Sequence, residues 1–170
     1  MQYKTVPYDH DLQHTLATLE NPGLLLTAAK PDGSVNAMTI GWGLWGIVWG
    51  RPILQVLVRF SRYTFEFVEA GQSFGVCVPN PEMRRWVGLC GTKSGRDIDK
   101  FAAQGHSYSM AEKAPVPLID GCPLAYVCRV VHHNDVIPAN LDPEIDARVY
   151  GDHDYHRIYF GEILTTLAAE

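Results

Sequence analysis

The chain has 170 residues, of which 46% are hydrophobic and 19% charged, the balance of a globular protein with a full core, so we expect residues 1–170 to form one domain. The formal net charge of −5 argues against nucleic acid as the main partner, because phosphate backbones are bound by a broad basic face. No apolar run reaches the roughly 18 residues that a membrane helix needs, and the first residues lack the apolar core of a signal peptide. The four cysteines have no C-x-x-C spacing, so we expect reduced thiols in a cytoplasmic protein and no metal site built from them.

The first part of the chain predicts a helix followed by a β-hairpin. Leucines recur at helical spacing between Asp9 and Glu20, which favours a short amphipathic helix. Apolar residues at 24–29 and 35–42 predict two strands, and the turn sequence at 30–33 has the proline and glycine that a β-turn prefers. We therefore expect these two strands to pair with each other.

The glycine-rich segment at 41–50 contains the glycine spacing of a dinucleotide-binding motif. That motif must open a helix after a strand, and the residues that follow here, up to Pro52, cannot form one. We interpret the segment as a bend between strands whose tryptophans fill space, with Trp42 as a flat side chain suited to a ring-binding site. Branched residues at 52–58 predict the next strand.

Three more short helices are predicted by residues that begin and end helices. The first has Ser61 or Thr64 as its cap, and the second opens with the sequence Asn80-Pro81-Glu82, which places a cap, a proline and an acid in the first turn. The third begins at Asp97. The three are expected at 63–70, 80–89 and 97–104, each closed by a glycine: Gly71, Gly91 and Gly105.

The rest of the chain predicts strands joined mainly by loops. Further strands are expected at 73–78, 123–133 and 157–164, with the C-terminal tail as a short extension of the last one. Residues 114–117 form an extended connector, and residues 137–154, rich in Pro, Asp and Asn, are expected to be a loop. Because the strand–helix alternation of a parallel sheet is absent, the expected fold class is mainly β, an antiparallel barrel with short inserted helices.

Two segments combine cations with hydroxyl groups, as an anion-binding site does. Residues 90–101, with the sequence CGTKSGRDIDKF, contain two glycines, two lysines and an arginine, and residues 59–64 have a similar character. Backbone N–H groups left accessible by glycine, next to fixed positive charge, suit a phosphate or another small anion. An acidic protein with two such segments points to a small anionic ligand.

Each of these cations also has a purely structural interpretation. Arg62 would pair with Glu66 one helical turn away. Arg96 and Lys100 lie four residues apart and share a face if a helix starts near Arg96, where the aspartates at 97 and 99 would neutralise them. Lys93 taken alone is best interpreted as a solvated surface residue.

The histidines do not predict a metal site. His153 and His156 are three residues apart, a spacing that converges on a helix but not in a segment that leads into a strand. We interpret His156 as a half-buried residue at the start of a strand. His132 and His133 are neighbours in a strand, so they face opposite sides. No Ser/His/Asp or Cys/His arrangement typical of nucleophilic catalysis stands out.

Taken in order, these segments resemble the flavin reductase-like family, whose members are FMN-binding split barrels that include flavoredoxin-type proteins. The resemblance covers residues 23–162 and is most specific in the SGRD-x-DKF sequence at 94–101. The segments that carry it are Asn36-Ala37-Met38-Thr39 with Trp42, Ser61-Arg62-Tyr63-Thr64, Cys90-Gly91-Thr92-Lys93-Ser94-Gly95-Arg96-Asp97, Asp99-Lys100-Phe101, the proline-containing connector at 114–119, and His156 followed by Tyr159-Phe160-Gly161-Glu162.

The resemblance implies a six-stranded antiparallel split β-barrel, a homodimer, and FMN bound near the dimer interface. Residues 38–42 would contact the isoalloxazine, Ser61 and Arg62 would hold the phosphate, and residues 92–95 with Lys100 would complete the site. His156 would lie close by and is the one candidate for a catalytic side chain, since the flavin itself carries the reaction. The residues that match the family's cofactor-binding positions are Asn36, Ala37, Met38, Thr39, Trp42, Ser61, Arg62, Tyr63, Thr64, Thr92, Lys93, Ser94, Gly95, Arg96, Lys100 and His156.

The implied function is that of an NAD(P)H-dependent flavin oxidoreductase that transfers a hydride to FMN, with NADH or NADPH as the reductant. Two alternatives stay open: a flavoredoxin-type electron carrier that holds FMN and takes electrons from a redox partner protein, and a barrel that binds another planar anion. A flavin needs a flat apolar slot, donors for its ring edge and cations for its phosphate, and the three segments offer these groups. A cation near flavin N1 and O2, either Lys100 or Arg96, would raise the reduction potential of the flavin.

Overall fold

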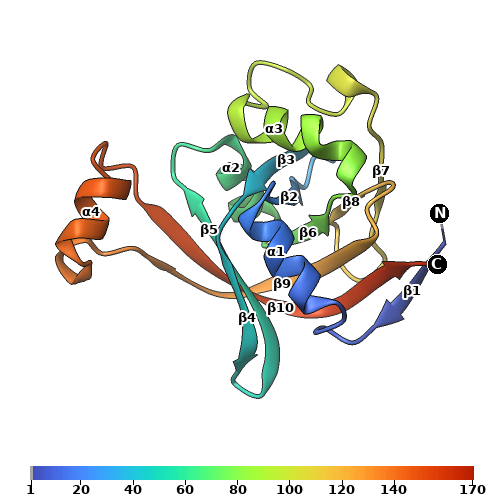
Figure 1. The fold of residues 1–170 in the computed structure, drawn as a ribbon, viewed down its shortest axis with the longest axis horizontal. Helices are drawn as coiled ribbons and strands as arrows, with labels where there is room; N and C mark the ends of the chain where they lie inside the picture. Colours follow the sequence, from blue (N-terminus) through green and yellow to red (C-terminus); the bar gives the residue numbers. More distant parts are fainter. Residues whose placement is uncertain (1) are drawn as a thin grey trace.

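An eight-stranded antiparallel sheet organises the chain in the computed structural model, which describes residues 2–170 (Figure 1). Its strands are β1 (Tyr3–Val6), β2 (Leu24–Ala29), β3 (Val35–Ile40), β4 (Gly43–Val48), β5 (Arg51–Arg59), β6 (Ser73–Val78), β9 (Leu124–Asp135) and β10 (His156–Ala169). Neighbouring strands follow the order β3-β2-β6-β9-β10-β5-β4, and β1 pairs with the end of β10. A second, two-stranded sheet pairs β7 (Tyr108–Met110) with β8 (Pro117–Ile119).

Short helices connect the strands, and capping residues explain where two of them begin. The helices are α1 (Leu12–Glu20), α2 (Tyr63–Gly71), α3 (Arg84–Thr92) and α4 (Pro143–Val149), with 3₁₀ turns η1 (Pro81–Met83), η2 (Ala102–Gln104) and η3 (Pro138–Asn140). Asn80 accepts a hydrogen bond from the backbone N–H of Met83 at 3.1 Å and so caps η1, which leads directly into α3. Asp142 caps α4 in the same way, with Pro143 in the first helical position. Within residues 2–170, every helix is too short or too polar to cross a membrane.

Two cores lie on opposite faces of the central strands. All residues of β2 and β6 are buried, because helices or other strands cover both faces. Alternate residues of β2 therefore enter different cores: Leu24 packs in the cluster that contains Phe67 of α2, and Leu25 packs in the cluster that contains Trp86 of α3. Helices α2 and α3 are thereby anchored on either side of the same pair of strands.

Helix α3 lies very close to strand β3. Thr39 Oγ1 donates a hydrogen bond to the carbonyl oxygen of Val87 at 2.5 Å. A Cβ atom at Gly91 would lie 3.3 Å from Cβ of Thr39, so a glycine at this position lets the helix end approach the strand. The loop that follows α3 therefore starts directly beside β3.

The expected fold class is confirmed: the protein is mainly β, with antiparallel strands and short inserted helices. The hairpin of β2 and β3 is also confirmed, with Thr27 paired to Ala37. The sheet has eight strands, because the six from β3 to β5 are extended by β4 at one edge and by β1 on β10. The short strands β1, β7 and β8 lie outside the predicted ones, since three or four residues are too few for a visible alternation.

The interpretation of residues 41–50 as a bend is wrong, because most of this segment forms β4 and pairs with β5 along its whole length. Glycines weaken the strand signal in the sequence, and pairing with β5 overrides that local preference. The turn itself lies at Trp49 and Gly50, which have φ values of 54° and 69°. The hairpin of β4 and β5 projects away from the rest of the molecule (Figure 1).

Two predicted helix ends are also wrong. Helix α2 includes Gly71 as its last residue and is followed by Gln72, which adopts a left-handed conformation with φ of 48°. Helix α3 contains Gly91 and ends at Thr92. Neither glycine is needed to stop its helix, and the close approach to Thr39 gives Gly91 a different purpose.

The helix expected from Asp97 to Gly105 does not form. Ser94 Oγ accepts a hydrogen bond from the N–H of Arg96 at 3.1 Å, and Asp99 Oδ1 accepts bonds from the backbone N–H groups of Phe101 and Ala102, each at 3.0 Å. Such local bonds between side chains and backbone compete with a helix. Only η2 remains, and it ends at Gly105 with φ of 69°.

The expectation of a loop at 137–154 is wrong in part, because it contains η3 and α4 (Figure 1). A signal for α4 was present in the sequence, since Asp142-Pro143-Glu144 combines a cap, a first-turn proline and an acid. The tail is an extension of the last strand, as expected, and β10 continues to Ala169.

Candidate functional site

A cavity of about 610 Å³ opens where three segments distant in the sequence meet. These segments are β3 with the residues after it, the turn between β5 and α2, and the end of α3 with its following loop, while the start of β10 closes one side. Of the residues predicted to bind a cofactor, all but Ala37 line this cavity: Asn36, Met38, Thr39, Trp42, Ser61, Arg62, Tyr63, Thr64, Thr92, Lys93, Ser94, Gly95, Arg96, Lys100 and His156. The structure therefore brings the predicted segments together in one place.

Ala37 is the exception among the predicted residues. Its side chain is fully buried in the core that contains Trp86, so it cannot contact a ligand in the cavity. Its carbonyl oxygen accepts a hydrogen bond from Lys100 Nζ at 2.7 Å. Ala37 thus contributes to this region through its backbone.

Strand β3 and helix α2 are joined at the floor of the cavity. Asn36 Nδ2 donates a hydrogen bond to Thr64 Oγ1 at 2.8 Å, and both side chains are buried. The loop after α3 packs on the same place, because a Cβ atom at Gly95 would clash with Asn36 and lie 3.0 Å from Tyr63 Cδ1. Glycine at position 95 is therefore required for this loop to close against β3 and α2.

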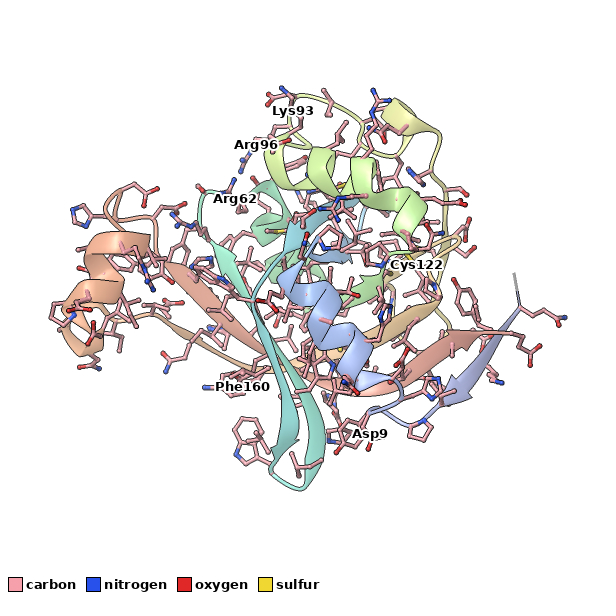
Figure 2. All side chains as sticks on the ribbon, viewed as in Figure 1. Asp9, Arg62, Lys93, Arg96, Cys122 and Phe160 are labelled. Carbon is pink, nitrogen blue, oxygen red and sulfur yellow. The ribbon has the colours of Figure 1, made fainter. Side chains whose placement is uncertain are left out.

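Arginine and lysine side chains gather at the mouth of the cavity. Arg62, Lys93 and Arg96 extend from the same side of the molecule (Figure 2). Arg96 is held by Glu66, with Nη2 to Oε1 at 2.6 Å, and by the carbonyl oxygen of Ser61, with Nη1 to O at 3.1 Å. Within residues 2–170 the side chain of Arg62 has no hydrogen bond or ion pair, so its guanidinium is available to a ligand.

The structural interpretations of these arginines are wrong. Glu66 binds Arg96 and Lys30 rather than Arg62, and the hydrogen bonds from Arg96 and then Lys30 lower the pKa of Glu66. Arg96 reaches across to α2 instead of pairing with its neighbouring aspartates, since the helix that would align them is absent. Asp97 is the one acidic residue among those that line the cavity.

Lys100 has a different environment from the other cations. It is buried, and its ammonium group donates to the carbonyl oxygens of Ala37 at 2.7 Å and Cys90 at 3.2 Å. Burial lowers the pKa of Lys100. An ammonium group has three donors, so a third N–H remains for the cavity that Lys100 lines. Lys100 and Arg96 do not share a helix face.

The hydroxyl groups of the site already have partners within the protein. Ser61 Oγ donates to Asp154 Oδ2 at 2.6 Å, and the N–H of Ser61 donates to Asp154 Oδ1 at 3.2 Å. Thr92 Oγ1 donates to the carbonyl oxygen of Gly88 at 2.8 Å. Each oxygen can still accept a hydrogen bond, but the arginines and backbone N–H groups are the stronger anion ligands here.

His156 is buried, not half-buried, at the first position of β10. Its Nδ1 lies 2.7 Å from the hydroxyl of Tyr150, and its ring centroid lies 5.1 Å from that of Trp42. Burial, followed by the charge of Arg59, lowers the pKa of His156 from 6.5 to about 4. The imidazole is therefore neutral at pH 7.

Leu57 and Arg59 of β5 also line the cavity; sequence reasoning missed Leu57, and it included Arg59 in the anion-binding segment 59–64 but not among the cofactor-binding residues. The two residues are two positions apart, so both lie on the same face of the strand. This period of two was visible in the sequence. Arg59 donates to Asp152 at 3.0 Å and to the carbonyl oxygen of Val149 at 2.8 Å, and so ties β5 to the segment after α4. Tyr150 was also missed, because only the fold of this segment brings it to His156.

Comparisons with known proteins find relatives of this chain. YddH, an uncharacterised protein of Escherichia coli K12, is 27% identical over 124 residues, which cover 71% of this chain and 65% of YddH. A high molecular weight rubredoxin of Moorella thermoacetica is 29% identical over 142 residues, covering 83% of this chain and 53% of the rubredoxin. The chain thus spans between about half and two thirds of the length of these relatives.

A solved structure is similar in fold to this chain. The flavoredoxin of Methanosarcina acetivorans has a TM-score of 0.69 and 27% identity, with 87% of this chain and 69% of the flavoredoxin covered. The family model for the flavin reductase like domain matches residues 16–170. This protein therefore belongs to the flavin reductase-like family.

Proposed function

We propose that this protein binds FMN in the cavity and acts as an NAD(P)H-dependent flavin oxidoreductase. The observation that carries the proposal is the convergence of the three predicted segments on one cavity with a cationic mouth. Arg62 and Lys93 come from two segments that are far apart in the sequence, and within residues 2–170 the side chain of Arg62 has no partner that would give it a structural role. A ligand with a charged tail and a ring system accounts for the arrangement.

The residues of the cavity fit FMN by volume and by chemistry. A volume of about 610 Å³ lies within the range of roughly 300–1,000 Å³ that small-molecule sites occupy. Arg62 stands at the start of α2, where unbonded backbone N–H groups and the helix dipole favour a phosphate. Met38 and Trp42 supply apolar surface for a tricyclic ring, and the buried Lys100 supplies a hydrogen-bond donor.

When bound, FMN supplies the redox chemistry, because it accepts a hydride from a nicotinamide and passes electrons onward. The side chains of this chain bind and orient. Arg62 would hold the phosphate together with the N–H groups of α2, and Arg96, fixed by Glu66, would keep the loop after α3 closed. Lys100 would donate to a polar atom of the ring and make that edge electropositive.

We also propose that a second copy of the chain covers the site. The outer face of the sheet borders the cavity, and a row of paired residues, two of them apolar, runs across it: Leu44, Gln55, Phe160 and His132. Leu44 is 64% exposed and Trp42 47% exposed, which is unusual for large apolar side chains on a sheet. Leu57 lies next along the same face and lines the cavity, so the surface and the site are continuous.

A test of the dimer uses Leu44→Glu, with Leu16→Glu on helix α1 as a control, since Leu16 is also exposed at 44%. We expect wild-type protein and the control to have a dimeric mass by light scattering, and Leu44→Glu to become monomeric with weaker FMN binding. A monomeric wild-type protein that binds FMN would contradict the proposed dimer.

A second candidate function is that of an electron carrier that holds FMN and receives electrons from a redox partner protein. It is favoured by the likeness to a flavoredoxin and to a high molecular weight rubredoxin, whose names denote electron-transfer proteins. Neither the cavity nor its cations distinguish a carrier from a reductase, because both must bind the same cofactor.

Oxidation of NADH and NADPH in the presence of FMN separates the candidates. The reductase proposal predicts turnover above that of free flavin, and a strong reduction of this turnover in Arg62→Ala but not in Arg85→Ala, an exposed arginine of α3 outside the cavity. FMN binding without turnover favours the carrier. If the protein does not bind FMN, the remaining possibility is a barrel that binds another planar anion.

A further inference from the structure

We propose that Tyr150 is a positioning residue that holds His156 as a neutral imidazole with its proton on Nε2, and that this N–H donates a hydrogen bond to a carbonyl oxygen of the heteroaromatic ligand in the cavity. The identity of the ligand rests on the proposed function. The contact between Tyr150 and His156 does not.

The side chains of Tyr150 and His156 are hydrogen-bonded to each other at the edge of the cavity. Tyr150 is 4% exposed and His156 is 8% exposed. The phenolic oxygen lies 2.7 Å from Nδ1, which is the distance of a strong hydrogen bond. His156 lines the cavity. Since Nδ1 is hydrogen-bonded to Tyr150, Nε2 is the ring nitrogen that is available to a ligand there.

The direction of this hydrogen bond follows from the chemistry of the two groups. A phenol is the stronger acid and an imidazole nitrogen the stronger base, so O–H···N is favoured over N–H···O. In the reverse direction the phenolic O–H would have no acceptor among residues 2–170, and an unpaired buried hydroxyl is costly. The imidazole therefore accepts at Nδ1 and carries its proton at Nε2.

The charged surroundings keep the imidazole neutral. Arg59 and Arg62 face it and disfavour a second positive charge, while Asp154 acts in the opposite direction and more weakly than burial and Arg59. Burial also raises the pKa of Tyr150, so the phenol keeps the proton that it donates. A neutral donor suits a carbonyl oxygen, because it polarises that oxygen without bringing a full charge into the site.

The segment after α4 is built to hold Tyr150 in place. Arg59 bonds to the carbonyl oxygen of Val149 at 2.8 Å, directly before Tyr150, and its guanidinium carbon lies 5.4 Å from the centre of the Tyr150 ring. The ring of Tyr155 also stacks on Tyr150, at 4.8 Å between centroids. Three contacts thus fix a tyrosine whose hydroxyl has the imidazole as its one partner in the described chain.

The experiment compares wild-type protein with Tyr150→Phe and with Tyr159→Phe. Tyr159 is a matched control, because it is a buried tyrosine of β10 whose hydroxyl donates to Glu69 at 2.7 Å, away from the cavity. Protein with ¹⁵N-labelled histidine is studied by NMR, with His156→Gln to assign the signals. We expect the Nε2–H tautomer in wild-type protein and in Tyr159→Phe, and a mixture of tautomers in Tyr150→Phe.

Binding measurements identify the carbonyl that receives the bond. FMN is titrated alone, and NAD⁺ is then titrated into the FMN-loaded protein. We expect Tyr150→Phe to weaken one of these two equilibria by about threefold to tenfold, the size of one neutral hydrogen bond, and Tyr159→Phe to leave both unchanged. Weakening of the first assigns the bond to FMN, and weakening of the second assigns it to the nicotinamide.

The outcomes separate this inference from the proposed function. An Nδ1–H tautomer in wild-type protein, or an unchanged tautomer in Tyr150→Phe, overturns the positioning role even if FMN binds. Equal affinities of wild-type protein and Tyr150→Phe for both ligands overturn the donor role of His156. A wild-type protein that binds neither ligand overturns the proposed function and the ligand half of this inference, whereas the tautomer spectrum still decides the role of Tyr150.

Discussion

The ammonium group of Lys100 lies 2.7 Å from the carbonyl oxygen of Ala37, which belongs to a strand 63 residues earlier in the chain. With its bond to Cys90, this contact links β3, the end of α3 and the loop that contains the SGRD sequence. A buried cation therefore holds together the segments that form the cavity. Its role is structural as well as electrostatic.

We expect Lys100→Met to lower the free energy of unfolding by about 1–3 kcal/mol, because it removes both hydrogen bonds that the buried ammonium group donates. FMN affinity should fall as well. Urea unfolding followed by fluorescence measures the first effect, and an FMN titration the second. Lys93→Met, at an exposed position of the same loop, should leave stability unchanged. Equal unfolding midpoints for Lys100→Met and wild-type protein would show that the buried ammonium is dispensable.

Arg62→Ala should weaken FMN binding by about 10- to 100-fold, which corresponds to the loss of a charge-assisted hydrogen bond worth about 1.5–3 kcal/mol. Its stability should be unaffected, because the guanidinium has no partner within residues 2–170. Calorimetric titration with FMN measures this loss, with Arg85→Ala as the control. If both variants bind FMN as wild-type protein does, the phosphate has been assigned to the wrong end of the cavity.

Gly95→Ala should displace the loop after α3, because the new methyl group would clash with Asn36 and crowd Tyr63. We expect weaker FMN binding and a lower melting temperature. Gly88→Ala is the matched control, since a Cβ at this position of α3 meets no atom within 4 Å and alanine favours a helix by up to about 1 kcal/mol. Crystal structures of both variants would show whether the loop moves in Gly95→Ala alone. Unchanged FMN binding by Gly95→Ala would show that the close approach of Gly95 to Asn36 does not matter for the site.

The depressed pKa of His156 predicts how stability depends on pH. Between pH 6.5 and about 4 the unfolded chain binds a proton at His156 and the folded chain does not, so acidification through this window destabilises the fold. The slope from one such group is at most about 1.4 kcal/mol per pH unit. In urea unfolding, the stability of wild-type protein relative to His156→Gln should therefore fall from pH 7 to pH 5. A difference that stays constant or grows would contradict a neutral His156 in the folded state.

The strands and the cavity were predictable to different degrees. Segments 24–29 and 73–78 are mostly apolar and short, which identifies them in the sequence as buried strands. The SGRD segment was recognised as part of a site, yet the helix predicted for it was wrong. The side chains of Ser94 and Asp99 accept hydrogen bonds from nearby backbone N–H groups, which compete with a helix. Residue types indicated the chemistry, while tertiary contacts determined the conformation.

The partners of individual side chains were the least predictable part. Helical spacing favoured Arg62 as the partner of Glu66, but Arg96 comes closer once the loop after α3 folds back. Lys100 looked equivalent to Arg96 in the sequence, and only the packing of α3 on β3 makes it a buried donor. Tyr150 had no signal at all, because its contact depends on the path of the chain through α4.

A titration of the purified protein with FMN, followed by the quenching of flavin fluorescence, tests the central claim most directly. Trp42 and the cationic mouth of the cavity predict saturable quenching with one FMN for each chain, weakened in both Arg62→Ala and Gly95→Ala. Flavin fluorescence that is unchanged by wild-type protein, or quenching by both variants that equals that of wild-type protein, would contradict the assignment of this cavity to FMN.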